Sequence, residues 1–289
     1  AALHKGKLGA LAHQRFVIHG AGAAAVGIAD QLVDAMVAEG IEADEARKKF
    51  WLLNREGLVW QGSENINNEQ KRYARQAEDF QDWVVTESDQ SCPLDLFAVV
   101  SHVKPSFLIG CSTASGAFDE SVVRNMADNH DRPVILPLSN PSSKSEAVPQ
   151  DLFDWTEGRA LIATGSPFAP VHWQGSELPV AQCNNAFIYP GLSLGLIVSK
   201  AQRLTSGMLI AASKALAAYA IDDDPMGSLL LPPLSAFPEY SKRTALSVAE
   251  AVRDEGFSDE SVHFDFTQGL EELTWEPEYL AYAFDPAVS

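Results

Sequence analysis

The stretch that decides the fold is Phe16-Val-Ile-His-Gly-Ala-Gly-Ala-Ala-Ala25. An apolar segment typical of a short strand runs into a Gly-x-Gly-x-x-Ala turn, and a helix is expected to open directly after it. Gly20 permits the tight turn, Gly22 lets backbone N–H groups approach an anion, and Ala25 is small enough for the helix to press on the strand. The helix N-terminus then offers free N–H groups and the positive end of its dipole to a pyrophosphate. The predicted dinucleotide loop consists of Gly20, Ala21, Gly22, Ala23, Ala24 and Ala25.

The composition is that of a globular protein and disfavours several classes of ligand. The 289 residues are 46% hydrophobic and carry a formal net charge of -18 at pH 7. Nucleic acid is not expected as a partner, because this charge has the wrong sign for binding a phosphate backbone. A small anionic ligand would be held by local backbone dipoles rather than by the overall field. No apolar run of membrane-spanning length and no secretory signal are apparent, so we expect a cytoplasmic protein that does not bind a membrane.

The pattern of elements predicts an α/β fold with a doubly wound parallel sheet, the Rossmann type, and a helical C-terminal extension. We assign residues 1–15 to a linker, 16–256 to the dinucleotide-binding domain and 257–289 to an irregular tail. Residues 61–92 are polar and are interpreted as a surface insertion with a helical stretch over 73–83. The expected strands are 16–19, 50–53, 106–110, 134–138 and 160–165, and the expected helices are 23–38, 41–49, 94–103, 120–129, 193–201, 206–219 and 239–255.

Polar residues follow the expected strands, and in a parallel sheet these positions meet in one crevice. Asn54 stands where an acidic residue usually binds the adenosine ribose, and its amide can still hydrogen-bond that diol. Arg55 would either pair with a 2′-phosphate or lie solvated on the surface. Asn140 and Asn185 carry donors and acceptors that suit a small hydroxy acid, although Asn-Pro also starts turns and Asn-Asn caps helices.

Groups for acid–base chemistry are few. His19 lies beside the glycine loop and is interpreted as a partly buried structural histidine. No Ser-His-Asp arrangement and no pair of carboxylates can be argued from the spacing. Cys92, Cys111 and Cys183 lack CxxC spacing and are expected to be reduced thiols rather than disulfides or zinc ligands. The sequence therefore predicts the cofactor-binding part of an enzyme without its proton-transfer groups.

Five runs of sequence, in the same order, resemble the NAD-binding domain of malic enzymes and the related malolactic enzymes. The resemblance implies that Asn140, Asn184 and Asn185 reach the bound malate and that NAD lies along the glycine loop and the strand ends. The family usually has Asp in place of Asn54, so NADP stays open as the cofactor. The runs are residues 20–29, 138–146, 155–160, 164–168 and 182–191. The implied cofactor contacts beyond the loop are Asn54, Arg55, Cys111, Ser112, Thr113, Asn140, Gly165, Ser166 and Asn185.

The resemblance also implies that the proton-transferring Tyr and Lys, and the acidic ligands of Mg²⁺ or Mn²⁺, lie upstream of the glycine loop. Nothing matching them occurs here, so we expect no catalytic and no metal-binding residue in this chain. Residues 1–15 are then interpreted as the remnant of a linker from a missing N-terminal catalytic domain.

The intact protein is expected to be a dimer or tetramer that converts malate and NAD to pyruvate, CO₂ and NADH. Three alternatives stay open: a malolactic enzyme, which forms lactate and CO₂ with bound NAD; an amino-acid dehydrogenase-like domain; and a non-enzymatic dinucleotide-binding module.

Overall fold

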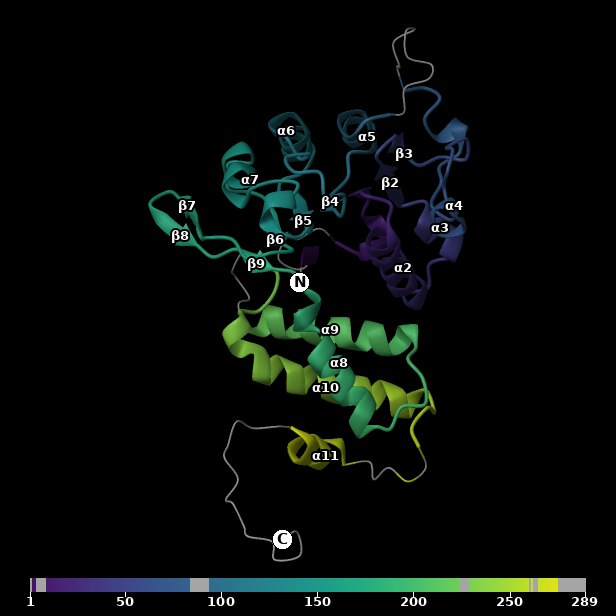
Figure 1. Ribbon diagram of the computed structural model, residues 1–289, viewed down its shortest axis with the longest axis vertical. Coiled ribbons are helices and arrows are strands. Elements are labelled where there is room, and N and C mark those ends of the chain that lie inside the picture. The colour runs from purple at the N-terminus through teal and green to yellow at the C-terminus, as the bar shows by residue number, and fades with distance from the viewer. Residues whose placement is uncertain are drawn as a thin grey trace, which may run out of the picture.

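The computed structural model describes residues 2–3, 9–83, 94–223, 229–259, 261 and 265–274. Its centre is a seven-stranded sheet in the order β3-β2-β1-β4-β5-β6-β9 (Figure 1). Neighbouring strands run parallel except for the antiparallel pair β2–β3 at one edge. A separate hairpin of β7 and β8 projects from the body of the molecule. The strands are β1 (Phe16–His19), β2 (Phe50–Asn54), β3 (Gly57–Leu58), β4 (Phe107–Gly110), β5 (Val134–Pro137), β6 (Leu161–Thr164), β7 (Val171–Trp173), β8 (Ser176–Leu178) and β9 (Ala181–Gln182).

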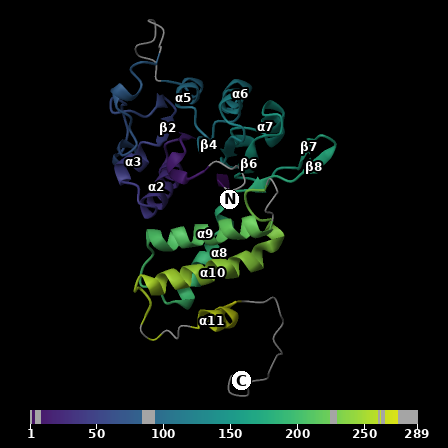
Figure 2. The same cartoon turned by 180° about the vertical axis from the view of Figure 1, so that it is seen from behind.

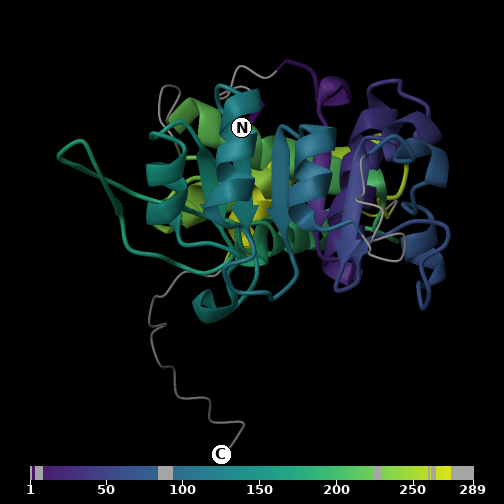
Figure 3. The same cartoon turned by 90° about the horizontal axis from the view of Figure 1, so that it is seen from above.

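Helices cover both faces of the sheet, which confirms the doubly wound fold (Figure 3). Phe16 and Ile18 of β1 face a core shared with α2 and α3, whereas Val17 faces the core under α5, α6 and α7. The strands are apolar throughout because both faces of a parallel sheet are buried. The bounds are α2 (Ala23–Ala38), α3 (Ala43–Arg47), α5 (Leu96–Val103), α6 (Glu120–Asn129) and α7 (Pro149–Trp155).

Three phenylalanines set the register of the first strands. The ring of Phe16 lies 4.7 Å from that of Phe50 and 4.8 Å from that of Phe107, between centroids. The same residues are register partners across β2, β1 and β4. A slip of one residue would turn each ring to the opposite face, so the register is strongly specified. As a result, β1, β2 and β4 end at the same level.

A second layer of helices lies beyond α2 (Figures 1 and 2). Its core is formed by α8 (Tyr189–Val198), α9 (Ser206–Asp223) and α10 (Phe237–Asp254), with α11 (Phe266–Leu273) against α8 and α10. Ser206 of α9 donates a hydrogen bond to Asp34 of α2 at 2.5 Å, which joins this layer to the nucleotide-binding half. In the described part of the chain, no helix is long and apolar enough to span a membrane.

The structure corrects several expectations. Residues 73–83 were predicted to be helical, but the helical structure within them is limited to the 3-10 turn η2 (Ala77–Asp79). The short helix α4 (Asn68–Lys71) ends before this range. The segment 257–289 is not wholly irregular, since α11 forms where Phe266 and Leu270 bury one face. The β7–β8 hairpin and β9 were not predicted, and Cys92 lies outside the described residues.

Two helical glycines give a matched test of the packing. A Cβ on Gly195 of α8 would lie 2.5 Å from the carbonyl oxygen of Ala245, whereas a Cβ on Gly27 of α2 would meet nothing within 4 Å. Gly195→Ala is expected to destabilise the fold by about 1–3 kcal/mol through overpacking, which outweighs the gain in helix propensity. Gly27→Ala should stabilise it by about 0.5–1 kcal/mol. Urea unfolding measures both, and equal effects of the two substitutions would contradict the close approach of α8 to α10.

Candidate functional site

The carboxyl ends of the parallel strands form one continuous edge. Backbone pairing continues one residue past the strands: the N–H of Gly20 donates to the carbonyl of Leu53 at 2.8 Å. The N–H of Cys111 likewise donates to the carbonyl of His19 at 2.8 Å. The turns that follow β1, β2 and β4 therefore begin side by side. Because β2 flanks β1 on one side and β4 on the other, the gap between β1 and β4 is the topological switch point, where ligands bind in such sheets.

The two glycines of the loop have different roles. Gly20 has φ of +126°, and a Cβ there would lie 2.6 Å from the carbonyl oxygen of Cys111, so the fold itself requires glycine. Gly22 has an ordinary φ of -76°, and a Cβ there would meet no heavy atom within 4 Å. Packing within the described part of the protein does not explain this second glycine. Its surroundings fit a position kept open for a ligand.

The N-terminus of α2 presents backbone N–H groups that no side chain caps. Gly22 is its N-cap, no side chain caps it, and its first turn contains no acidic residue. The first N–H to find a partner is that of Val26, which donates to the carbonyl of Gly22 at 3.0 Å. In the described residues, the N–H groups of Ala23, Ala24 and Ala25 have no acceptor. A negative charge at such a terminus is stabilised by up to about 2 kcal/mol.

A polar cavity of about 540 Å³ opens beside this helix end. It is lined by the glycine loop, by Asn54 and Arg55 after β2, by the turn after β4, and by Gln70 of α4. The side-chain amide of Gln70 donates to the carbonyl of Ala21 at 2.7 Å, which fixes the loop from the outside. The carbonyl oxygen of the Asn54 side chain accepts from the N–H of Glu56 at 2.8 Å, so this residue forms a turn as well as lining the cavity.

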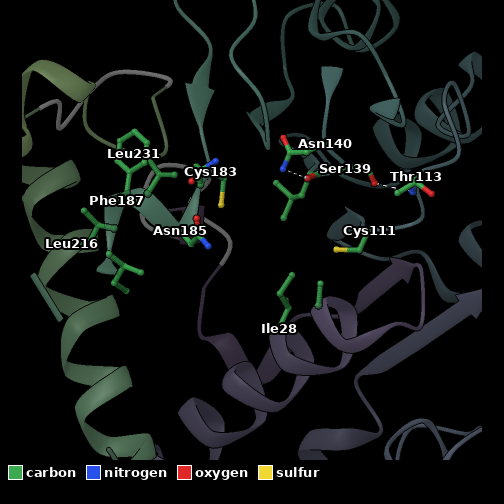
Figure 4. Close-up of a pocket in the computed structure, with 14 residues that line it drawn as sticks. Ile28, Cys111, Thr113, Ser139, Asn140, Cys183, Asn185, Phe187, Leu216 and Leu231 are labelled. Carbon is green, nitrogen blue, oxygen red and sulfur yellow. Dashed lines mark hydrogen bonds between the residues drawn. The ribbon is translucent and has the colours of Figure 1, made fainter. Parts of the chain in front are cut away.

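A second, largely apolar cavity of about 560 Å³ lies on the other side of the turn after β4 (Figure 4). Ile28 of α2 borders it, and Phe187, Leu216 and Leu231 close its far side. The three asparagines that were predicted to bind substrate all line it: Asn140, Asn184 and Asn185. Cys111 and Thr113 line both cavities, so the two spaces meet at the turn after β4.

The predicted site residues do not all take part in the same way. The side chain of Asn184 accepts from the N–H of Ala186 at 2.9 Å and so caps the 3-10 turn η4 (Asn185–Phe187). Gly165 and Ser166 do not line either cavity. A Cβ on Gly165 would lie 2.1 Å from the carbonyl oxygen of Leu138, and Ser166 donates to the side-chain oxygen of Asn140. These two residues therefore contact the turn after β5 and hold it in place without lining a cavity.

The comparison with known protein families agrees with this geometry. Residues 1–253 match the family model described as "Malic enzyme, NAD binding domain". The chain belongs to this family. It is 42% identical over 276 residues to the NAD-dependent malic enzyme of Acinetobacter baylyi, covering 94% of this chain and 47% of that protein. It is also 42% identical over 269 residues to NAD-dependent malic enzyme 3 of Bacillus subtilis, covering 93% of this chain and 47% of that protein.

Solved structures give the same fold. The malic enzyme of Entamoeba histolytica superposes with a TM-score of 0.66 at 22% identity, over 94% of this chain and 49% of that one. The malic enzyme of Pyrococcus horikoshii superposes with a TM-score of 0.67 at 19% identity, over 94% of this chain and 54% of that one. The chain thus spans about half the length of the curated relatives it matches.

The sequence did not reveal two residues that matter to the geometry of this malic enzyme family domain: Gln70, which lines a cavity, and Glu146, which bonds to the turns around it. Gln70 sits in the polar insertion, where the pattern Asn67-x-x-Gln70 of a capping box was the available signal. Glu146 is fully buried behind the turns after β4 and β5, and no periodicity marks it. Long-range contacts of this kind leave no trace in local sequence.

Burial governs the titratable groups beside the two cavities. Burial raises the pKa of the Cys111 thiol to about 12, with smaller contributions from Glu146 and Cys183. Burial also raises the pKa of Cys183. Both thiols are therefore protonated at neutral pH and are poor nucleophiles and metal ligands. Within the described residues, no three His, Cys, Asp or Glu side chains gather in a way that could hold a metal ion.

His19 gives the malic enzyme domain a testable acid sensitivity. Burial lowers the pKa of His19 below 6.5, against the opposing charge of Glu146, and its Nδ1 is buried without a partner among the described residues. Below about pH 6.5 His19 binds a proton in the unfolded chain but not in the folded protein. The free energy of unfolding therefore decreases as the pH decreases, by at most about 1.4 kcal/mol per pH unit. His19→Leu should flatten this slope in urea unfolding between pH 7.5 and 5.5. Exposed His172 provides the control, His172→Gln, and an unchanged slope in His19→Leu would contradict the assignment.

Proposed function

We propose that this domain binds NAD across the two cavities, with the pyrophosphate at the N-terminus of α2. One observation carries the proposal. The N–H groups of Ala23, Ala24 and Ala25 have no partner among the described residues, and they lie next to Gly22, where open space remains and packing does not require glycine. The net charge of -18 opposes an anion in general. Physiological salt screens charges that lie farther away than the Debye length of about 8 Å. The donors in direct contact with the anion therefore decide whether it binds.

The adenosine half of NAD suits the polar cavity, where Asn54 would bind the ribose diol. The nicotinamide half suits the apolar cavity beside Asn140 and Asn185. Bound there, the nicotinamide ring supplies a hydride acceptor, and the asparagines would orient the group that reacts with it. NAD is favoured over NADP because the relatives above are named NAD-dependent. NADP stays an alternative, since Arg55 lines the same cavity as Asn54 and could pair with a 2′-phosphate.

For the intact protein we propose a malate-decarboxylating oxidoreductase that forms pyruvate, CO₂ and NADH. Asn140, Asn184 and Asn185 would contact malate, while the proton-transfer groups and the Mg²⁺ or Mn²⁺ ligands would come from the part that relatives have and this chain does not include. A dimer or tetramer is proposed on the family resemblance alone. A malolactic enzyme, which returns the hydride and releases lactate, is the alternative that uses the same crevice.

The first test is Gly22→Val with calorimetric titration of NAD. The side chain has room in the protein and an acceptable φ, but it would occupy the space in front of the α2 N-terminus. NAD affinity should fall at least about tenfold, while stability falls by no more than about 1 kcal/mol from the poorer N-cap. Gly27→Ala, on the same helix outside both cavities, is the control. Unchanged affinity in Gly22→Val would mean that the loop is a turn and not a binding site.

The second test is a product assay with malate and NAD. The 289-residue chain alone should release no CO₂, because in this proposal the proton-transfer groups and the metal ligands belong to the part of the relatives that this chain does not include. The longer protein should give pyruvate together with NADH, read at 340 nm by absorbance. Lactate without net reduction of NAD would assign the malolactic reaction instead. Sustained turnover by the 289-residue chain alone would contradict the division of the active site between two parts.

A further inference from the structure

Glu146 is a fully buried carboxylate behind the turns that follow β4 and β5. One of its oxygens accepts from the N–H and from the hydroxyl of Ser112, each at 2.8 Å. The same oxygen accepts from the hydroxyl of Ser139 at 2.5 Å, and the other oxygen accepts from the N–H of Ser139 at 3.3 Å. Ser112 lies in the turn after β4 and Ser139 in the turn after β5. One side chain therefore joins the two turns.

The direction of these hydrogen bonds follows from the backbone. The N–H of Ala114 donates to the hydroxyl of Ser112 at 3.1 Å, and the N–H of Thr113 donates to the hydroxyl of Ser139 at 2.9 Å. Each hydroxyl thus accepts from an amide and directs its own hydrogen to Glu146. In the part of the chain that the structure describes, four donors and no acceptor face its two oxygens, which matches a group that only accepts hydrogen bonds. Among the described residues it forms no ion pair, so hydrogen bonds alone compensate its burial.

The end of β4 is shaped to admit this carboxylate. A Cβ on Gly110 would lie 2.4 Å from the carboxyl carbon and from one oxygen of Glu146. Gly110 is not in the left-handed region, so its backbone conformation does not require glycine. Glycine is required because a Cβ would occupy the space of the Glu146 carboxylate. Gly110 and Glu146 therefore form a structural pair beneath the turn after β4.

The group held by this network is Thr113. It has φ of +58°, an unfavourable conformation for a β-branched residue, and it lines both cavities. Its N–H is held by Ser139, which is held in turn by Glu146. Sparsely populated backbone conformations persist where the surroundings over-determine them, and they cluster at ligand sites.

We propose that Glu146 is a positioning residue for the cofactor. Its carboxylate holds Thr113 at the junction of the two cavities, so that both halves of a dinucleotide meet one preformed crevice. The inference rests on the proposed NAD site. Without Glu146 the turn is free to relax toward ordinary backbone conformations, and NAD then has to order it on binding, which weakens the observed affinity.

The test titrates NAD into the 289-residue chain by calorimetry and follows melting of each variant. Glu146→Ala should bind NAD at least about tenfold more weakly than the unaltered chain. Glu146→Gln can keep three of the four contacts, because its single oxygen can take the place of the one that accepts three. It should restore affinity to within about threefold. A role in folding alone would not produce this rescue.

Thr156→Val is the matched control. Thr156 is also fully buried, donates to the carbonyl of Leu152 at 2.6 Å and accepts from the N–H of Ala160 at 3.2 Å, but it lines neither cavity. It should lower the melting temperature and leave the Kd for NAD unchanged. Gly110→Ala should weaken binding by displacing the carboxylate. Its effect should not add to that of Glu146→Ala, since both act on one contact.

The outcomes separate the two proposals. If the unaltered chain does not bind NAD, the proposed function fails. If it binds and folded Glu146→Ala binds within about twofold of it, the positioning role is overturned. Should Glu146→Ala not fold, Ser139→Ala replaces it, because that change removes only the hydroxyl between Thr113 and Glu146. A loss of about threefold or more is then expected, and an unchanged Kd overturns the proposal.

Discussion

Parallel pairing of β1 between β2 and β4 is the constraint on which the rest of the structure depends. The contacting rings of Phe16, Phe50 and Phe107 fix the register at one end, and three strands consequently finish at the same level at the other. Their turns are then forced into contact, with Gly20 pressed against the carbonyl of Cys111. The crevice is a product of sheet geometry, and the side chains that line it are placed by that geometry rather than by local preference.

The glycines around the crevice are of two kinds, those that packing requires and one that packing does not explain. A Cβ on Gly20, Gly110 or Gly165 would collide with a neighbouring atom, so those positions follow from packing. Gly22 faces open space at an ordinary φ and has no such explanation within the described residues. Its position in front of free helix N–H groups supports our proposal that a bound anion explains its small size. In that proposal NAD binding centres on α2, and the turns after β4 and β5 complete the crevice from the opposite side.

The sequence predicted the sheet well because buried parallel strands are continuous apolar runs, as at residues 50–53 and 134–138, and because the amphipathic helix over 120–129 has a strong period. Short or distant features were not predictable. β9 has two residues, and the tail helix α11 shows its pattern mainly through Phe266 and Leu270. The candidate asparagines were identified from their places after strands and from a family resemblance. Gln70 was missed because it contacts Ala21, 49 positions away, and Glu146 because it joins nearby Ser139 to Ser112, which is 34 positions away.

Chemical-shift mapping of the backbone amides during an NAD titration tests the central claim most directly. If the pyrophosphate rests on the first turn of α2, the amides of Ala23, Ala24 and Ala25 should shift most, by forming hydrogen bonds that they lack in the free protein. Amides of α11, on the far side of the helical layer, should not move. Saturable binding that leaves those three alanine amides unperturbed would contradict the account.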